Sequence, residues 1–364
     1  MKLIFIGDIC TDSYSKSDVN TFKNTKLYHF LNNYEGIVIG NLEAPLLSEA
    51  IRENRNKYSL INQTNLFDLY SFCDYFNLAN NHILDQGVEG LDKTIDGLVS
   101  RSKGFFGAGN NLQQSREPKI IEIDGKKIGI LSYCCISSNS ESYANNSSGG
   151  PSPLIYEYVK EDIDAIRKLV DHIIVLPHWG KENEFFPTYD QASIARKIIE
   201  LGADVIIGAH THTIQAFEYY KGNPIYYSLG NFLFNNFSVS EFDKYYQGKY
   251  NKEGLLVELD FSHDKVIARE HYIKLDEKML PELAELEDLQ TPVRSNNDYI
   301  NSVLGEFEFK KLESNLNLSL KFNGQSMQVI NESPLIGNSY KPRIESFKVK
   351  IKRYMIYFIK KALR

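Results

Sequence analysis

The chain has 364 residues, of which 42% are hydrophobic and 24% are charged, and its formal net charge at pH 7 is −6. This composition is typical of a globular protein with one large domain, or one large domain and a smaller appendage. The negative net charge argues against nucleic acid as the partner, because a phosphate backbone attracts clustered positive charge.

The N-terminal segment and the cysteines both bear on the cellular compartment. The first residues contain only a four-residue apolar run before Gly7 and Asp8, too short for a secretion signal or a membrane span. The four cysteines have neither CxxC spacing nor the density of a disulfide framework: Cys10, Cys73, Cys134 and Cys135. We therefore expect a cytoplasmic protein with free thiols.

Strands and helices alternate along the first 230 residues. Short apolar runs predict buried strands at residues 2–6, 36–40, 75–79, 104–106, 172–176, 205–207 and 224–228. Apolar residues at helical spacing predict helices at residues 21–32, 65–74, 87–100, 161–169 and 190–201. Two hairpins are predicted, at 120–133 and 255–273, the first from its Asp-Gly turn. This pattern predicts an α/β fold with mixed sheets.

Two stretches beside these elements leave alternatives open. Residues 139–153 are rich in Ser, Asn and Gly, and we expect a loop that is either a lid or mobile. The aromatic residues Trp179, Phe185 and Phe186 either form a rim for the substrate or pack in the core.

The C-terminal part follows a different pattern. We expect a boundary after residue 275, because the stretch that follows contains two prolines and an acidic run. Residues 276–343 form a weakly patterned extension, to which no fold is assigned. Residues 344–364 carry seven Lys or Arg among apolar residues and predict a basic amphipathic helix. Such a helix either lies on an anionic membrane surface or packs on the acidic body of the protein.

Five predicted strands each lead into side chains that can bind a metal ion. These side chains are Asp8, Glu43, Asn81 with His82, His178, and the pair His210 and His212. Because the ends of strands in one sheet lie along one edge, we expect these residues to converge. Carboxylate, imidazole and amide donors suit Zn, Mn or Fe better than Ca or Mg alone.

The same residues suggest a hydrolytic reaction. A carboxylate that bridges two cations about 3.5–4 Å apart would generate a hydroxide nucleophile by lowering the pKa of bound water toward about 7. His82 would then be free to act as a general acid on a leaving group. Asp85 follows three residues later and either orients the His82 ring or caps the helix at residues 87–100.

The order of the motifs resembles that of a known family. The chain contains Gly7-Asp8, Asn41-Leu42-Glu43, Ala79-Asn80-Asn81-His82 with Asp85-x-Gly87, Gly107-Ala108-Gly109, His178-Trp179-Gly180 with Glu182, Gly208-Ala209-His210-Thr211-His212, and Ser228-Leu229-Gly230-Asn231-Phe232. Over about residues 2–273 this order resembles the CapA family of capsule and poly-γ-glutamate synthesis proteins. That family is similar to the calcineurin-like metallophosphoesterases. The resemblance implies a metallophosphoesterase-like β-sandwich of mixed sheets flanked by helices, here with a C-terminal extension.

The resemblance also implies roles for individual residues. Two divalent metal ions would be bound, the first by Asp8 and His212, the second by Asn81, His178 and His210, and both by Glu43. His82 would be the catalytic histidine. Three further residues of the motifs would contact the substrate or the metal ligands: Asn41, Glu182 and Asn231. Glu182 is alternatively an ordinary surface residue.

Two positions depart from the metallophosphoesterase pattern. The chain has Asp8-Ile9-Cys10 where those enzymes carry Asp-x-His, and Glu43 where they carry a bridging Asp. Cys10 either replaces the missing imidazole as a thiolate ligand or is a buried, inert cysteine, and we expect the second.

The function implied by the resemblance is that of a metal-dependent hydrolase of phosphoester or amide bonds in the synthesis of capsule, poly-γ-glutamate or another surface polymer. Its partner would be an anionic polymer, or a phosphorylated or glycan precursor. The alternative is a non-catalytic accessory subunit of the synthesis and export machinery. A phosphatase or phosphodiesterase unrelated to capsules is a third interpretation, which rests on fold analogy alone. If the basic helix lies on a membrane and does not pack on the acidic body, it would place the protein at the inner face of the membrane.

Overall fold

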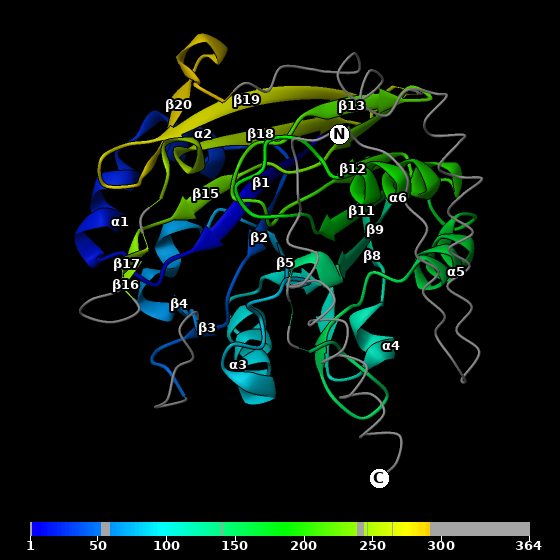
Figure 1. Ribbon diagram of the computed structural model, residues 1–364, viewed down its shortest axis with the longest axis horizontal. Coiled ribbons are helices and arrows are strands. Elements are labelled where there is room, and N and C mark those ends of the chain that lie inside the picture. Colours follow the sequence, from blue (N-terminus) through cyan, green and yellow to red (C-terminus); the bar gives the residue numbers. More distant parts are fainter. Residues whose placement is uncertain are drawn as a thin grey trace, which may run out of the picture. The chain divides into compact units, whose positions relative to one another are not determined.

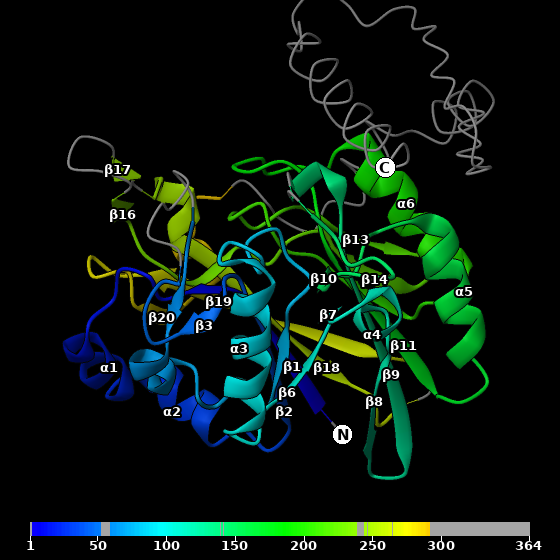
Figure 2. The ribbon, with the colours of Figure 1, turned by 90° about the horizontal axis from the view of Figure 1, so that it is seen from below.

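Two stacked β-sheets with helices on both outer faces form the body of the protein (Figures 1 and 2). The structure is a computed structural model that describes residues 2–51, 59–138, 140, 142–238, 244–245, 247–263 and 265–291. The chain divides into two units, residues 1–308 and 309–364, and every described residue belongs to the first. The predicted α/β sandwich of mixed sheets flanked by helices is confirmed.

The first sheet has eight strands. Its order is β20-β19-β18-β1-β2-β5-β6, and β15 also pairs with β1. The strands are β1 (Lys2–Cys10), β2 (Ile37–Leu42), β5 (Tyr75–Asn77), β6 (Gly104–Phe106), β15 (Asn231–Phe234), β18 (Glu253–Asp260), β19 (Ile267–Leu275) and β20 (Pro281–Ala284). Strands β1, β2, β5, β6 and β15 run parallel, whereas β18 joins β1 antiparallel.

The second sheet has six strands in the order β13-β14-β12-β11-β9-β8. They are β8 (Lys119–Ile123), β9 (Lys126–Cys134), β11 (His172–His178), β12 (Val205–Ile207), β13 (Phe217–Tyr220) and β14 (Asn223–Tyr226). The inner four are parallel, and the predicted hairpin of β8 and β9 turns at Asp124 and Gly125, both with positive φ. Three two-stranded pairs complete the β-structure: β3 (Leu46–Leu47) with β4 (Asn62–Gln63), β7 (Ala108–Gly109) with β10 (Gly150–Pro151), and β16 (Phe237–Ser238) with β17 (Lys244–Tyr245).

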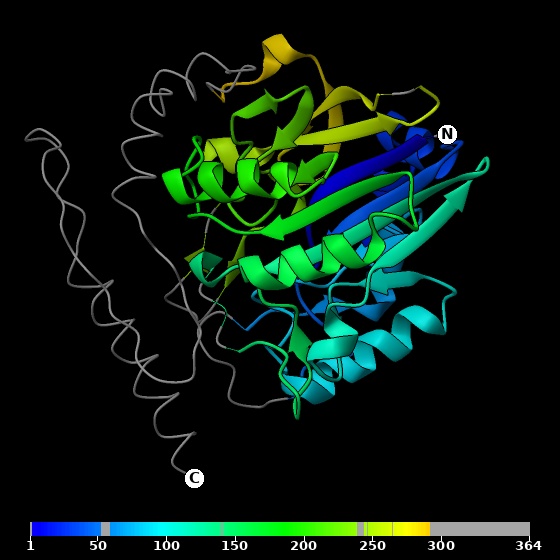
Figure 3. The ribbon, with the colours of Figure 1, turned by 90° about the vertical axis from the view of Figure 1, so that its right-hand side faces the viewer.

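Helices cover the outer face of each sheet. They are α1 (Lys16–Lys23), α2 (Lys26–Asn32), α3 (Gly87–Val99), α4 (Leu112–Ser115), α5 (Tyr156–Ile166) and α6 (Tyr189–Glu200), with short 3-10 turns η1 (Thr64–Leu69), η2 (Ile136–Ser138), η3 (Lys249–Lys252) and η4 (Leu286–Asp288). Figure 3 shows α5 and α6 over the second sheet. Along β1, Ile4 and Ile6 pack toward the helices, whereas Phe5 faces the space between the sheets, as the period of two in a strand requires.

Several predicted elements differ from those in the structure. The helix expected at 21–32 is two helices, because the Thr25 hydroxyl donates to the Phe22 carbonyl oxygen at 2.8 Å and accepts the Tyr28 N–H at 3.1 Å, which caps α2. The helix expected at 65–74 is only the 3-10 turn η1, which ends before the chain enters β5.

The stretch at residues 139–153 is tied into the fold. Its strand β10 pairs with β7, and the Asn145 carbonyl oxygen accepts the N–H of Leu112 at 2.9 Å. These contacts hold the described part of the segment against the main body.

The first sheet extends past residue 275, where we placed the domain boundary. Strand β20 pairs with β19, and the buried Glu253 carboxylate accepts the N–H groups of Gln290 at 2.7 Å and Thr291 at 2.8 Å, together with the Thr291 hydroxyl. The folded body therefore reaches residue 291. The rest of the predicted extension and the basic helix at 344–364 lie outside the described residues. Within the described part of the chain, no helix has the length and apolar character to cross a membrane.

Thr291→Val should lower the free energy of unfolding by about 1–3 kcal/mol, because it removes one donor to a buried carboxylate. Urea unfolding at neutral pH measures the change. Thr21→Val is the control, since the Thr21 hydroxyl donates only to the Ser17 carbonyl oxygen of its own surface helix. An equal effect of both substitutions would show that Glu253 does not anchor this segment.

Candidate metal centre

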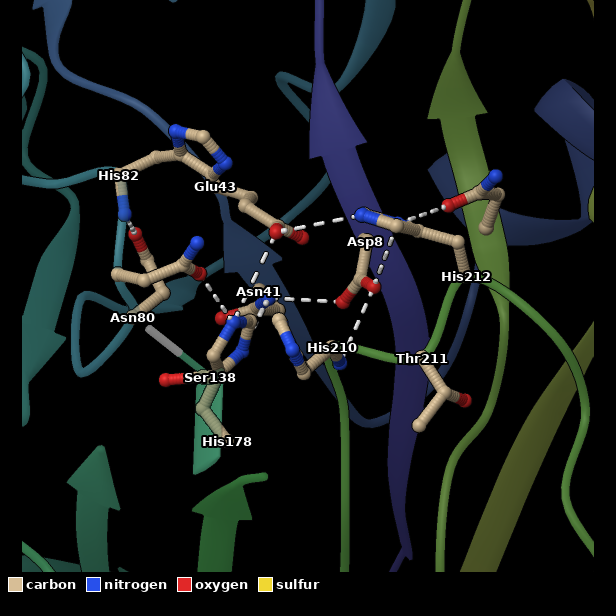
Figure 4. Close-up of polar contacts among 12 residues, drawn as sticks. Asp8, Asn41, Glu43, Asn80, His82, Ser138, His178, His210, Thr211 and His212 are labelled. Carbon is tan, nitrogen blue, oxygen red and sulfur yellow. Dashed lines mark hydrogen bonds and ion pairs between the residues drawn. The ribbon is translucent and has the colours of Figure 1, made fainter. Parts of the chain in front are cut away.

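The predicted ligands gather where the parallel strands of both sheets end (Figure 4). Asp8 lies near the end of β1, Glu43 directly follows β2, and Asn81 lies in the turns after β5. His178 ends β11, and the segment after β12 carries His210 and His212. Each sheet thus contributes three of the six predicted ligands.

Local backbone features bring these residues together. The register of β1 against β2 shifts between Ile6 and Asp8, an irregularity that turns the Asp8 side chain away from the outer face. A Cβ atom at Gly7 would lie 2.0 Å from the Gly230 carbonyl oxygen, and one at Gly208 would lie 2.0 Å from the Tyr227 carbonyl oxygen. Only glycine permits these close approaches, which let the 227–231 segment pass directly beside the site.

The side chains form two groups that share Glu43. In the first group the ligand atoms of Asp8, Glu43 and His212 all lie within 4.8 Å of one another, and in the second those of Glu43, His178 and His210 do so. The Glu43 Oε1 atom is 3.7 Å from the Nε2 atoms of both His178 and His212. Glu43 therefore occupies the place of a carboxylate between two cation positions.

The backbone at His210 and His212 is strained. His210 has φ of +100° and His212 has φ of +56°, which are uncommon for residues other than glycine. The His210 N–H donates to Asp8 Oδ2 at 3.3 Å, and the Asn251 amide donates to the His212 carbonyl oxygen at 3.0 Å. His212 Nδ1 lies 3.0 Å from Asn231 Oδ1. Such strain persists only where surrounding contacts fix it, and it concentrates at functional sites.

Burial and neighbouring charges shift the pKa values of the carboxylate and the imidazoles in this site, some upward and some downward. Burial and the Asp8 charge raise the pKa of Glu43 well above its usual value. Burial and neighbouring imidazoles lower the pKa of His178 and His210. Burial also lowers the pKa of His212, but the hydrogen bond and charge of Asp8 outweigh it, so this pKa is raised overall. The site thus favours neutral His178 and His210.

His82, which follows the predicted ligand Asn81, forms a pair with Asp85. The His82 Nδ1 atom lies 2.8 Å from Asp85 Oδ2, which also accepts the Leu60 N–H at 2.6 Å. The His82 side chain is 16% exposed, whereas that of His178 is fully buried. Helix α3 is preceded by Gln86 at the N-cap position. The interpretation of Asp85 as a helix cap is therefore wrong, and the residue orients the ring.

A family model described as "Bacterial capsule synthesis protein PGA_cap" matches residues 2–236. The chain belongs to this family. Its relatives include capsule biosynthesis protein CapA of Bacillus anthracis, 27% identical over 65% of this chain and 60% of that protein, and PGA biosynthesis protein CapA of Bacillus subtilis, 28% identical over 64% and 62%. A probable polyglutamine synthesis accessory protein of Mycobacterium tuberculosis is 28% identical over 42% of this chain and 43% of its own length. The chain spans about three fifths of the length of the two CapA proteins.

Solved structures with a similar arrangement share little sequence with this PGA_cap chain. A novel phosphatase of Mycoplasma pneumoniae is 18% identical, with a TM-score of 0.47 over 75% of this chain and 93% of that one. A putative 5'-nucleotidase of Staphylococcus aureus is 14% identical, with a TM-score of 0.44 over 86% and 58%.

The residues of this PGA_cap chain fit a bound cation. Both carboxylate oxygens of Glu43 and both ring nitrogens of His210 are buried without a hydrogen-bond partner. A buried polar atom without a partner costs about 1–3 kcal/mol. Because these atoms lie within one ligand group, a single cation would satisfy several of them at once. A metal ion held by the group would therefore explain why these buried atoms have no hydrogen-bond partner.

Cys10 lies in a small apolar cluster with Ala44, Leu60 and Phe234. Burial, together with the charge of Asp12, raises the pKa of its thiol. Neither ligand group found among the described residues includes it. A thiol in this environment is a poor ligand, because only the thiolate binds metals strongly.

The other predicted contacts differ in kind. Glu182 is exposed on the loop after β11, and its charge adds to burial and to the Asp8 charge in raising the pKa of Glu43. Trp179 is buried, stacks on Tyr227 and donates to the Tyr227 carbonyl oxygen at 2.9 Å, so it belongs to the core and not to a substrate rim. Phe185 is partly buried and packs against Tyr250 with ring centroids 4.6 Å apart.

Three residues that support the site belong to none of the sequence motifs. Asn77 and Ser132 lie within buried strands and connect to Asn41 by hydrogen bonds. Asn251 holds the His212 backbone from a segment without any pattern. The only sequence signal for any of the three is a polar residue in an apolar strand, which applies to Asn77 at the end of β5 and to Ser132 in β9.

Cys10→Ala should leave the stoichiometry and dissociation constant of Mn²⁺ binding unchanged, because the thiol belongs to neither ligand group. It should lower the free energy of unfolding by about 1 kcal/mol through lost packing. Isothermal titration calorimetry measures the first effect and urea unfolding the second. Cys73→Ala, another buried cysteine of the first sheet's core, is the control. A tenfold weaker affinity for Cys10→Ala alone would make Cys10 a ligand.

Glu43→Gln should stabilise the metal-free protein at neutral pH by an amount on the order of 1–3 kcal/mol. The raised pKa of Glu43 means that the folded state binds the proton more tightly than the unfolded state. That contribution to stability is complete below the usual value of 4.5 and is lost as the pH rises towards the folded-state pKa. Glutamine cannot ionise and removes this loss.

Urea unfolding in chelator between about pH 5 and about pH 8 tests this expectation. The exposed Glu122→Gln is the control and should change stability by less than about 0.5 kcal/mol. With Mn²⁺ added, wild type should gain stability and Glu43→Gln should not. A Glu43→Gln variant less stable than wild type in chelator would contradict the prediction.

Proposed function

We propose that the chain is a metal-dependent hydrolase that cleaves a phosphoester or amide bond during the synthesis of capsule, poly-γ-glutamate or another surface polymer. The observation that carries the proposal is the Glu43 carboxylate, which is buried, lacks a hydrogen-bond partner and is shared by two groups of ligands. Membership of the PGA_cap family supports the polymer context.

The residues present determine which cations fit. Asp8, Glu43 and His212 would hold one ion, and Glu43, His178 and His210 the other. The Asn81 amide oxygen lies 2.8 Å from His178 Nε2, close enough to join the second set. Oxygen and imidazole donors without a thiolate suit Mn, Zn or Fe. When bound, such ions supply Lewis acidity and lower the pKa of water.

His82 would supply the proton that the leaving group needs. Asp85 accepts a hydrogen bond from the Nδ1–H group, so Nε2 is the atom that exchanges a proton with the substrate. The carboxylate holds the ring in one orientation, and the Leu60 N–H fixes the carboxylate in turn. A ring that is oriented and partly exposed can donate its Nε2 proton to the departing oxygen or nitrogen.

An accessory role without catalysis is the second candidate. The Mycobacterium tuberculosis relative carries that description in its name. In this case the cations would stabilise the fold or a docking surface, and His82 would be dispensable. The anionic partner and the membrane surface predicted from the sequence remain predictions.

His82→Ala should reduce turnover by about 10²–10⁴-fold, because it removes the general acid. The content of bound metal should not change, since His82 belongs to neither ligand group. Suitable substrates are p-nitrophenyl phosphate, bis-p-nitrophenyl phosphate and γ-glutamyl-p-nitroanilide, each assayed with the protein loaded with Mn²⁺, Zn²⁺ or Fe²⁺. His29→Ala, a substitution of an exposed histidine in α2, is the control.

The outcome decides between the two candidates. Turnover that depends on His82 and on added metal supports the hydrolase. Metal binding without any turnover that depends on His82 would refute it and favour the accessory role.

A further inference from the structure

We propose that Ser132, Asn77 and Asn41 form a buried relay of hydrogen bonds that orients the Asn41 amide and thereby fixes Asp8 for cation binding. The inference rests on the cation site proposed above and adds positioning residues to it. The polar atoms of Asn77 and Ser132 are engaged in the hydrogen bonds of the relay, so we expect their effect on the cation to pass through Asn41 and Asp8.

The relay crosses the space between the two sheets. The Ser132 hydroxyl in β9 donates to Asn77 Oδ1 in β5 at 2.6 Å and also lies 3.0 Å from the Leu176 carbonyl oxygen. Asn77 Nδ2 donates to Asn41 Oδ1 in β2 at 3.1 Å, and Asn41 Nδ2 donates to Asp8 Oδ1 in β1 at 2.8 Å. All four residues are at least 95% buried. In this environment water does not compete for the donors, so the chain of contacts is fixed.

The Asp8 carboxylate and the Ala79 backbone N–H determine how the two amides are oriented. The Asp8 carboxylate can only accept, so Asn41 must turn its NH₂ group towards it. The Asn41 oxygen then needs a donor, which is the NH₂ group of Asn77. The Asn77 oxygen accepts the Ala79 N–H at 3.0 Å as well as the Ser132 hydroxyl. If either amide were flipped, two acceptors would face each other on one side of that amide and two donors on the other side.

This orientation separates the two oxygens of Asp8. Oδ1 is held by the Asn41 amide, whereas Oδ2 lies 3.4 Å from His212 Nδ1, on the side of the first ligand group. Asn41 Nδ2 also lies 3.5 Å from His178 Nδ1. Asn41 thus presents a donor to the site, and its own oxygen is not free to bind a metal.

A purely structural asparagine makes different contacts. Asn62 is equally buried, but its amide donates to the Ala44 carbonyl oxygen at 3.0 Å and accepts the Thr11 N–H at 2.8 Å. Those contacts hold backbone segments together. The Asn41 amide instead forms hydrogen bonds with the side chains of Asn77 and Asp8, and Asp8 is a proposed ligand. This difference indicates that Asn41 supports the cation site and does not merely stabilise the core.

Asn77→Asp tests the relay with a side chain of the same shape. It replaces the donor to Asn41 with an oxygen, so that two acceptors face each other. A cavity of about 20 Å³ borders both Asn41 and Asn77, which gives the Asn41 amide room to turn its oxygen towards Asp8. Mn²⁺ binding to the metal-free full chain should weaken at least tenfold, with loss of one of two ions per chain, measured by isothermal titration calorimetry.

Ser132→Ala provides a second, milder variant in case Asn77→Asp does not fold. Its expected effect is two- to fivefold weaker Mn²⁺ binding, because the Ala79 N–H still orients Asn77. Ser140→Ala is the matched control, since Ser140 is also a buried serine and its hydroxyl donates to the Ser142 carbonyl oxygen at 2.8 Å. The control should not change Mn²⁺ affinity.

A double-mutant cycle with Asp8→Asn identifies the path of the effect. If the relay acts through Asp8, Asn77→Asp should weaken Mn²⁺ binding much less in the Asp8→Asn background than in wild type. A lower melting temperature in chelator with unchanged Mn²⁺ affinity and stoichiometry, for both relay variants, would overturn the relay and leave the cation site intact. Wild type that binds no Mn²⁺, Zn²⁺ or Fe²⁺ would overturn the cation site itself, and with it the relay.

Discussion

The centre of the structure is a carboxylate, Glu43, that the described part of the chain buries without giving it a hydrogen bond. Three imidazoles surround it, and burial disfavours both its charge and the protonation of His178 and His210. A bound cation would make this unfavourable arrangement favourable in free energy, because it accepts lone pairs from the carboxylate and the imidazoles. The strained backbone at His210 and His212 is a further cost that cation binding would offset. The surrounding fold maintains this strain, which serves a purpose only when the two rings bind a ligand.

The site depends on the packing of the two sheets against each other. The first sheet supplies Asp8, Glu43 and Asn81, and the second supplies the three histidines. The chain crosses from the second sheet to the first between β14 and β15, and in doing so places Asn231 beside Asp8 in register and against His212. A change in the distance between the sheets would therefore separate the ligands before it exposed the core. Glycines at the crossing, where no Cβ fits, keep this distance short.

The ligands could be predicted from the sequence because each one follows an apolar strand, and parallel strands end at a common edge. The relay could not, because Asn77 at the end of β5 and Ser132 in β9 are single polar residues of apolar strands, and no pattern in the sequence predicts their partners. Strand β15 was missed for a related reason: its pairing with β1 joins residues more than 220 positions apart. That pairing sets Cys10 opposite Phe234 and so decides that its thiol faces an apolar cluster. Such long-range neighbours are absent from any local pattern.

The exclusion of thiols gives the centre its chemical character. Two cysteines lie close to it, Cys10 in β1 and Cys134 beside His178 in register. Burial raises the pKa of both, that of Cys134 to about 12. Neither thiol is therefore ionised at neutral pH, and the proposed ligand set is restricted to carboxylate, imidazole and amide groups. These donors select against soft ions such as Cu(I), which prefer thiolate. Because neutral thiols also resist oxidation, the fold keeps sulfur near the metal ligands without exposing the site to oxidative loss.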